Sequence, residues 1–519
     1  MYSEMLRTNG IGKGDVCAIV IRHNSEFYPL YMGVVGCGAV PAVLAYPNTR
    51  LHPEKFIQGI EGMSQRSGLD YVLTERDLES LITPFVSKEG STVRGIHFPL
   101  EWQYDEALHG KVKDELKVIR ASFELESPLL LQHSSGTTGL QKPVLLSHKA
   151  VIKHSVNYGK SIRINKSDKT VSWLPLYHDM GLIAVFHLAL ASGITLIQLD
   201  PFEWVLAPSI LLEAASSENA TLAWLPNFAF SLMADKIDDY DLEDVNLKNI
   251  RLIVNCSEPV RYDSMSKFAD RFSSFNLNPD AISCCYAMAE AAFAVTQTEP
   301  GLFPKAIRVD RKKFAEGKIE INEEDQSGKI CVSSGKPIQN CSVKIVDENR
   351  HELAEGYTGE VAVWSEAIFN GYRNYPEKTA EVLEGGWYYT GDIGFVCDGY
   401  YYIIGRKKDI IIVAGKNIYP EDVEAVVTKV EGVIPGRVVA FGQDNAELGT
   451  EQISIIAETA FEDEAARKKL RIAIVKAGTE NEYSISKVYL AQPRWLIKSS
   501  AGKPSRKANK ERILNGEIK

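Results

Sequence analysis

The 519-residue sequence lacks any apolar run close to the roughly 18–20 residues that a helix needs to span a bilayer. Its opening segment, MYSEMLRTNGIGKGD, lacks the basic and then apolar regions of a secretory signal peptide. The eight cysteines include no C-x-x-C pair, which argues against a zinc ribbon or a thioredoxin-like site. A few scattered cysteines in a chain of this length suit reduced core thiols, so we expect a cytoplasmic protein without a membrane span.

Positive charge is outnumbered by negative charge. Lys and Arg number 58 against 68 Asp and Glu, which gives a formal net charge of −10. This balance argues against nucleic acid or an anionic membrane as the main partner, but it allows a local cationic pocket. The apolar share of 45% and the charged share of 24% are those of a folded chain and exclude extensive disorder.

Short apolar runs alternate with amphipathic stretches in the first half of the chain. Residues 15–22, 128–132 and 250–255 are typical of buried strands, and residues 263–271 of a helix. This alternation predicts an α/β fold with two sheets of the parallel type. After about residue 296, short alternating runs predict a smaller, β-rich and more antiparallel part.

A separate small α+β unit is predicted at the C-terminal end. A helical pattern at residues 422–429 and a strand-like run at residues 437–442 follow a charged turn at residues 405–409. The predicted domains are therefore residues 1–405 and residues 406–519. Residues 307–330 are strongly charged and weakly apolar, which predicts a surface excursion with little core of its own.

The most informative stretch is SSGTTGLQK at residues 134–142, directly after a predicted strand. Backbone amides and Thr hydroxyls in such a turn can surround an anion, and the closing lysine adds positive charge. It is not a Walker A loop, because no G-x-x-x-x-G-K-[ST] pattern occurs. Taken alone, such a stretch is more often a flexible turn.

Six further segments of interest follow along the chain. Together with the loop they resemble the adenylate-forming superfamily, which comprises acyl-CoA synthetases, peptide synthetase adenylation domains, luciferases and fatty acyl-AMP ligases. The resemblance extends from Asp15 to Arg506. It rests on WLPLYHDMGL (173–182), NCSEPVR (255–261), YAMAE (286–290), YTGDIG (389–394), GRKKDIIIVAGKNIYP (405–420) and KSSAGKPSR (498–506).

The resemblance implies a set of residues that bind ATP. Asp392 would accept the ribose hydroxyls, and Arg406 would reach the ribose or a phosphate. The adenine would lie beside Tyr286, Ala287 and Met288 and beside the turn formed by Asn255, Ser257, Glu258 and Pro259. The phosphate loop would consist of Ser134, Ser135, Gly136, Thr137, Thr138, Gly139 and Lys142.

The resemblance also implies catalytic roles. Lys503 would neutralise the charge that builds up between the substrate carboxylate and the α-phosphate, and His178 would close over that carboxylate. Glu290 and Thr138 would bind Mg²⁺. Lys408 would form the hinge of a mobile C-terminal domain. Without the resemblance, a core histidine paired with its neighbouring aspartate is the commoner case for His178, and a carboxylate at a helix N-terminus is the better interpretation of Glu290.

Several positions depart from the family patterns. Gln141 and Pro143 replace Pro and Gly after the phosphate loop, Ala287 replaces Gly, and Pro504 replaces an apolar residue. Family members also have a further strand and helix before the position of Gly14, so the chain is expected to be short at its front.

The resemblance implies that ATP activates a carboxylic acid, favoured to be a fatty acid, as acyl-AMP with release of pyrophosphate. A phosphopantetheine thiol then takes the acyl group. LPNF (225–228), NIYPEDVE (417–424) and the position of residues 307–330 favour the fatty acyl-AMP ligase branch, whose acceptor is an acyl carrier protein. The alternatives are an acyl- or aryl-CoA ligase that uses free CoA and, less favoured, a non-catalytic nucleotide-binding relative.

Overall fold

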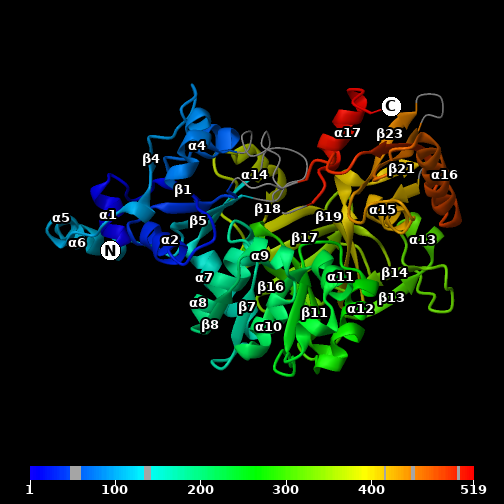
Figure 1. Ribbon diagram of the computed structural model, residues 1–519, viewed down its shortest axis with the longest axis horizontal. Helices are drawn as coiled ribbons and strands as arrows, with labels where there is room; N and C mark the ends of the chain where they lie inside the picture. Colours follow the sequence, from blue (N-terminus) through cyan, green and yellow to red (C-terminus); the bar gives the residue numbers. More distant parts are fainter. Residues whose placement is uncertain (47–59, 134–141, 414–415, 446–449, 499–502, 519) are drawn as a thin grey trace.

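The computed structural model describes residues 1–46, 60–133, 142–413, 416–445, 450–498 and 503–518 (Figure 1). The N-terminal elements (blue) and the C-terminal elements (orange and red) lie toward opposite ends of the long axis, with the central α/β elements (green) between and below them. The predicted α/β fold, with a large N-terminal region and a smaller C-terminal part, is confirmed.

A four-stranded parallel sheet forms the N-terminal part, in the order β2-β1-β3-β4. Every residue of its first three strands is buried, which explains why their sequences are continuous apolar runs. The strands are β1 (Val16–Val20), β2 (Val40–Val43), β3 (Tyr71–Thr74) and β4 (Gly95–His97). The helices are α1 (Tyr2–Thr8), α2 (Phe27–Gly36), α4 (Glu79–Val86), α5 (Glu106–His109) and α6 (Lys113–Ala121).

A seven-stranded sheet forms the centre, in the order β15-β12-β11-β10-β9-β7-β8. Its five strands from β11 to β8 are parallel, and β12 and β15 join in antiparallel orientation. The strands are β7 (Lys169–Ser172), β8 (Thr195–Gln198), β9 (Leu222–Pro226), β10 (Leu252–Cys256), β11 (Ile282–Ala287), β12 (Ala294–Gln297) and β15 (Lys336–Pro337). The helices are α7 (His148–Ser161), α8 (Leu188–Ser192), α9 (Pro201–Leu206), α10 (Ile210–Ser217), α11 (Asn227–Lys236) and α12 (Tyr262–Phe272).

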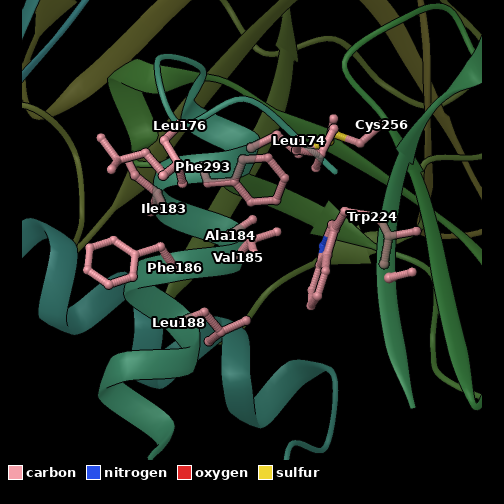
Figure 2. Close-up of a cluster of buried hydrophobic side chains, with 14 of the residues drawn as sticks. Leu174, Leu176, Ile183, Ala184, Val185, Phe186, Leu188, Trp224, Cys256 and Phe293 are labelled. Carbon is pink, nitrogen blue, oxygen red and sulfur yellow. The ribbon is translucent and has the colours of Figure 1, made fainter. Parts of the chain in front are cut away.

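The main hydrophobic core joins this sheet to the π-helical segment Met180–His187. Figure 2 shows Ile183 and Val185 of that segment with Trp224 of β9. Trp224 is 1% exposed, and its indole N–H donates to the Tyr158 hydroxyl at 2.9 Å. Trp224 is therefore an aromatic core residue.

An antiparallel sheet supplies the predicted β-rich part. It contains β16 (Cys341–Val346), β17 (Gly359–Ser365), β18 (Leu383–Glu384), β19 (Trp387–Cys397) and β20 (Tyr400–Arg406), and α14 (Pro376–Val382) precedes β18. The two-residue turn between β19 and β20 places Asp398 at φ 52° and Gly399 at φ 72°. Both angles are positive, as in the I′ hairpin turns that favour Asp-Gly.

The charged residues 307–330 contribute apolar side chains to a core that they share with later strands. Strands β13 (Ala306–Val309) and β14 (Lys329–Val332) pair in antiparallel orientation around α13 (Arg311–Ala315). Ile307, Val309 and Phe314 are buried against β19 and β20. The segment therefore shares a core with strands that follow it in the chain, which its local pattern did not reveal.

The C-terminal elements form a hairpin and a three-stranded sheet with helices. They are β21 (Ile411–Val413), β22 (Lys416–Ile418), α15 (Pro420–Thr428), β23 (Val438–Asn445), β24 (Thr450–Glu458), α16 (Glu464–Glu480), β25 (Ile485–Ala491) and α17 (Arg506–Leu514). These elements enclose a hydrophobic cluster that includes Val423, Ile455 and Ile474. The α+β character predicted for this part is therefore present.

All eight cysteines are among the described residues and are free thiols, as expected from their spacing. Within the described ranges, no helix combines the length and apolar character that crossing a membrane requires.

Candidate functional site

A cleft of about 2030 Å³ is bordered by the central sheet, the antiparallel sheet and the C-terminal elements. It brings together most of the predicted site residues that the structure describes. These are Lys142, His178, Ser257, Glu258, Pro259, Tyr286, Ala287, Met288, Glu290, Asp392, Arg406, Lys408 and Lys503. The predicted loop residues Ser134, Ser135, Gly136, Thr137, Thr138 and Gly139 lie outside the described residues.

The carboxyl ends of parallel strands explain one wall of this cleft. Strands β9, β10 and β11 run side by side, and the segments that follow them carry Phe228, Glu258 and Glu290. In open α/β sheets, ligands bind outside this edge, because the loops that leave it converge there. Hydrogen bonding also joins two of the turns, since the Phe228 backbone N–H donates to Glu258 Oε2 at 2.8 Å.

Asp392 is held by two partners at the floor of the cleft. Its strand β19 pairs with β20 so that Asp392 stands directly opposite Arg406, and Arg406 Nε lies 2.8 Å from Asp392 Oδ1. The Tyr286 hydroxyl donates to the other carboxylate oxygen. The contact with Asp392 raises the pKa of Arg406, and burial together with Asp392 raises that of Tyr286. The result is a fixed anionic acceptor beside a permanent cation.

Glu290 lies in a buried network that also contains Tyr372. The Tyr372 hydroxyl donates to Glu290 Oε1 at 2.7 Å, and Lys142 Nζ lies 3.3 Å from the same hydroxyl. Burial lowers the pKa of Lys142. Sequence reasoning missed Tyr372, because nothing in its local pattern separates it from the other tyrosines among the 22 in the chain.

His178 and Asp179 form a close pair at another point of the cleft wall. His178 Nδ1 lies 2.6 Å from Asp179 Oδ1, and the Met180 backbone N–H donates to the same oxygen at 2.8 Å. Burial opposes ionisation of Asp179, but His178 and these hydrogen bonds outweigh it and lower the pKa of Asp179. The imidazole is thus held in one orientation while it lines the cleft.

Lys503 and Lys408 reach the cleft from the C-terminal part. Burial lowers the pKa of both ammonium groups. Lys408 belongs to the single 3₁₀ turn Lys407–Asp409, which directly follows β20. This position is the junction between the antiparallel sheet and the C-terminal elements.

Asn255 differs from the other predicted residues. Its side chain is fully buried and does not line the cleft. Its Nδ2 donates to Asn227 Oδ1 at 3.0 Å, and the Arg261 backbone N–H donates to that same oxygen at 3.1 Å. Asn255 therefore supports the turn from behind and does not form its surface.

Comparison with known proteins places this site in a family. The profile of the AMP-binding enzyme family matches residues 1–373. The chain belongs to the AMP-binding enzymes. It is 30% identical to the 4-hydroxyphenylalkanoate adenylyltransferase of Mycobacterium tuberculosis (strain ATCC 25618 / H37Rv), over 97% of this chain and 83% of that protein.

Other AMP-binding enzymes show similar correspondence. The long-chain-fatty-acid–AMP ligase FadD26 of Mycobacterium marinum (strain ATCC BAA-535 / M) is 30% identical, over 96% of this chain and 87% of that protein. A structure from a study of fatty acyl-adenylate ligases from E. coli and L. pneumophila has the same fold, with a TM-score of 0.86 at 24% identity over 99% of this chain and 90% of the other. The predicted membership of the adenylate-forming superfamily, near the fatty acyl-AMP ligase branch, is confirmed.

Proposed function

We propose that this AMP-binding enzyme activates a carboxylic acid with ATP, forming acyl-AMP and pyrophosphate, and then passes the acyl group to a phosphopantetheine thiol. The observation that supports it most is the convergence of Asp392, Arg406, Glu290 and Lys503 on one cleft from distant parts of the chain. The reaction joins two anions, so it needs fixed acceptors for the ribose and cations for the phosphates and carboxylate. This cleft offers both.

Mg²⁺ fits the donor set at Glu290. Within the described ranges, no group of three or more His, Cys, Asp or Glu side chains forms a cage for a metal ion. Mg²⁺ that accompanies nucleotide phosphates needs no cage, because one or two carboxylates, water and the phosphates complete its coordination. We propose Glu290 and Thr138 as its protein ligands. Bound there, the ion would neutralise phosphate charge.

The substrate acid is proposed to lie against an aromatic wall near His178. The indoles of Trp173 and Trp204 stack with centroids 3.7 Å apart, and the Phe228 ring lies at 64–66° to both. Trp173 and Phe228 line the cleft together with Phe202. An apolar wall beside a site for a carboxylate suits a fatty acid, whose chain leaves water on binding.

We propose that the chain is divided into two domains at the hinge. Residues 1–405 would form the large domain and residues 406–519 a mobile domain that turns at Lys408 and carries Lys503. Free thiols in all eight cysteines support a cytoplasmic location.

Exchange of radioactive pyrophosphate into ATP tests the first step directly. We expect exchange that depends on an added carboxylic acid, when saturated fatty acids of several lengths and phenylalkanoic acids are offered. ATP binding in calorimetry without exchange for any acid would contradict the proposal and would indicate a non-catalytic relative.

An acyl carrier protein is the proposed acceptor, in preference to free CoA. Residues 307–330 support this choice because they contact the C-terminal part at several points. Lys329 Nζ pairs with Asp422 of α15, Arg311 Nη1 lies 3.3 Å from the Tyr483 hydroxyl, and the rings of Phe314 and Tyr419 are 5.3 Å apart. Such contacts would restrain the rotation that a CoA-using enzyme needs for thioester formation.

Lys329→Met should therefore raise acyl-CoA formation several-fold, since it removes the ion pair with Asp422. Acyl-AMP would be supplied with either CoA or holo-carrier protein, and the thioester products would be separated by chromatography. Lys305→Met is a matched control, because Lys305 also pairs with an aspartate, Asp398, and lies near a tyrosine ring. Rapid acyl-CoA formation by the unaltered enzyme would overturn the choice of acceptor.

A further inference from the structure

Lys503 belongs to the second of two described stems, residues 497–498 and 503–505, which are joined to each other. Lys498 and Pro504 form an antiparallel bridge, and the Ser505 backbone N–H donates to the Ile497 carbonyl at 2.9 Å. Asn509 of α17 is fully buried and secures the same stems. Its Oδ1 accepts from the Ile497 N–H at 2.8 Å, and its Nδ2 donates to the Ile497 and Ser505 carbonyls at 2.9 and 2.8 Å. Lys503 is thus tied to the start of α17.

Arg506, the first residue of α17, extends this connection to the hinge. Its Nη1 lies 2.7 Å from Asp409 Oδ2, in the single turn that contains Lys408. Its Nη2 lies 2.9 Å from Glu424 Oε1 and 3.2 Å from Glu421 Oε1. Its Nε donates to the Ala440 carbonyl at 2.8 Å. One guanidinium therefore joins α17, the hinge turn, α15 and β23.

The charges around Arg506 make this connection depend on its guanidinium group. Three carboxylates, from Asp409, Glu421 and Glu424, surround a single guanidinium whose side chain is 16% exposed. Burial raises the pKa of Glu421, while Arg506 acts against that rise. Removing the cation would leave buried carboxylates uncompensated. A lysine could not replace it, because its single nitrogen lacks the planar fork that meets several acceptors at once.

We propose that Arg506 is a positioning residue that transmits the setting of the hinge turn to Lys503. The hinge turn, Arg506 and these two stems then move as one body. Lys503 is in the cleft only when the hinge has the setting described here. The inference rests on the proposed function, since it assigns a task to Lys503 in acyl-AMP formation.

The two half-reactions test this role. Arg506→Lys should lower the rate of acyl-AMP formation by about 10- to 100-fold, because a misplacement of about 1 Å can cost that much. The KM values for ATP and the acid should change little. Transfer of the acyl group from supplied acyl-AMP to the acceptor should keep its rate. Equal loss in both half-reactions would reveal general damage and overturn the proposal, and so would full activity in both.

Asp409→Asn provides a second variant that is less disruptive. It weakens only the contact with the hinge turn and leaves Arg506 with Glu421 and Glu424. We therefore expect a smaller loss in the rate of acyl-AMP formation, again with an unchanged rate of acyl transfer. The control is Arg512→Gln on the same helix, where the guanidinium lies 4.0 Å from the centre of the Trp495 ring. Pyrophosphate exchange by the unaltered enzyme distinguishes a failure of this inference from a failure of the proposed function. Absence of exchange would refute the proposed function whatever the variants do.

Discussion

Replacing Lys503 with alanine should lower the rate of acyl-AMP formation by about 10²–10³-fold, the usual cost of removing one preorganised group that meets charge developing in a transition state. Lys503 is a cation that the C-terminal part brings into the cleft. Burial has already removed part of its hydration, which lowers its pKa. Its charge is therefore available to the reacting oxygens without displacement of a full water shell.

Pyrophosphate exchange at saturating ATP and acid would measure this effect. Lys507→Ala is the matched control, since Lys507 lies in the same basic segment but is 60% exposed and pairs only loosely with Glu511 at 3.9 Å. An unchanged exchange rate for Lys503→Ala would remove Lys503 from the reaction.

The pH profile gives an independent check of the same residue. The lowered pKa means that Lys503 loses its proton, and with it its positive charge, at a pH below the ordinary lysine value of 10.5. Exchange should therefore decline on the alkaline side as the pH rises through that lowered pKa. Lys503→Arg should shift this decline to higher pH, because a guanidinium keeps its proton.

Asp392→Asn should raise the KM for ATP and lower kcat/KM by about 10- to 100-fold. Each hydrogen bond to a charged group contributes about 1.5–3 kcal/mol. The substitution keeps the size of the side chain but replaces an ionised acceptor, and it also removes the ion pair with Arg406. Ribose recognition and the orientation of Arg406 are both expected to weaken.

Initial rates over a range of ATP concentrations would separate the two parameters for Asp392. Tyr286→Phe is a graded companion, since it removes only one of the groups that orient the carboxylate, and a smaller rise in KM is expected. Asp398→Asn in the turn of the same hairpin serves as the control. A Kd for ATP that stays unchanged in Asp392→Asn would exclude the ribose contact.

Most of the fold and much of the candidate site could be predicted from the sequence, for identifiable reasons. Buried parallel strands such as Val16–Val20 are continuous apolar runs, so they could be located directly. Asp392 and Arg406 lie in local motifs, so both could be named, but their pairing depends on the register of β19 and β20. Tyr372 joins Glu290 through a contact 82 positions apart in the chain, which no local pattern encodes.

Two features of the structure go beyond what local sequence could indicate, for physical reasons. Asn255 is part of a motif, but its side chain points into a hydrogen-bond network behind the turn. The charged segment at residues 307–330 has a core because Val309 and Phe314 are buried against strands that come much later in the chain. Long-range packing of this kind depends on the topology and not on local composition.

The hairpin of β19 and β20 restricts how the length of this chain can vary. Its tight Asp398–Gly399 turn and the register shift between Ile393 and Gly394 together set Asp392 opposite Arg406. A single inserted residue within β20 would turn Arg406 to the opposite face of the sheet, because side chains alternate along a strand. The same insertion would also displace Lys408, which lies two positions after Arg406. Insertions and deletions in homologous chains should therefore avoid these two strands and collect in the exposed loops around them.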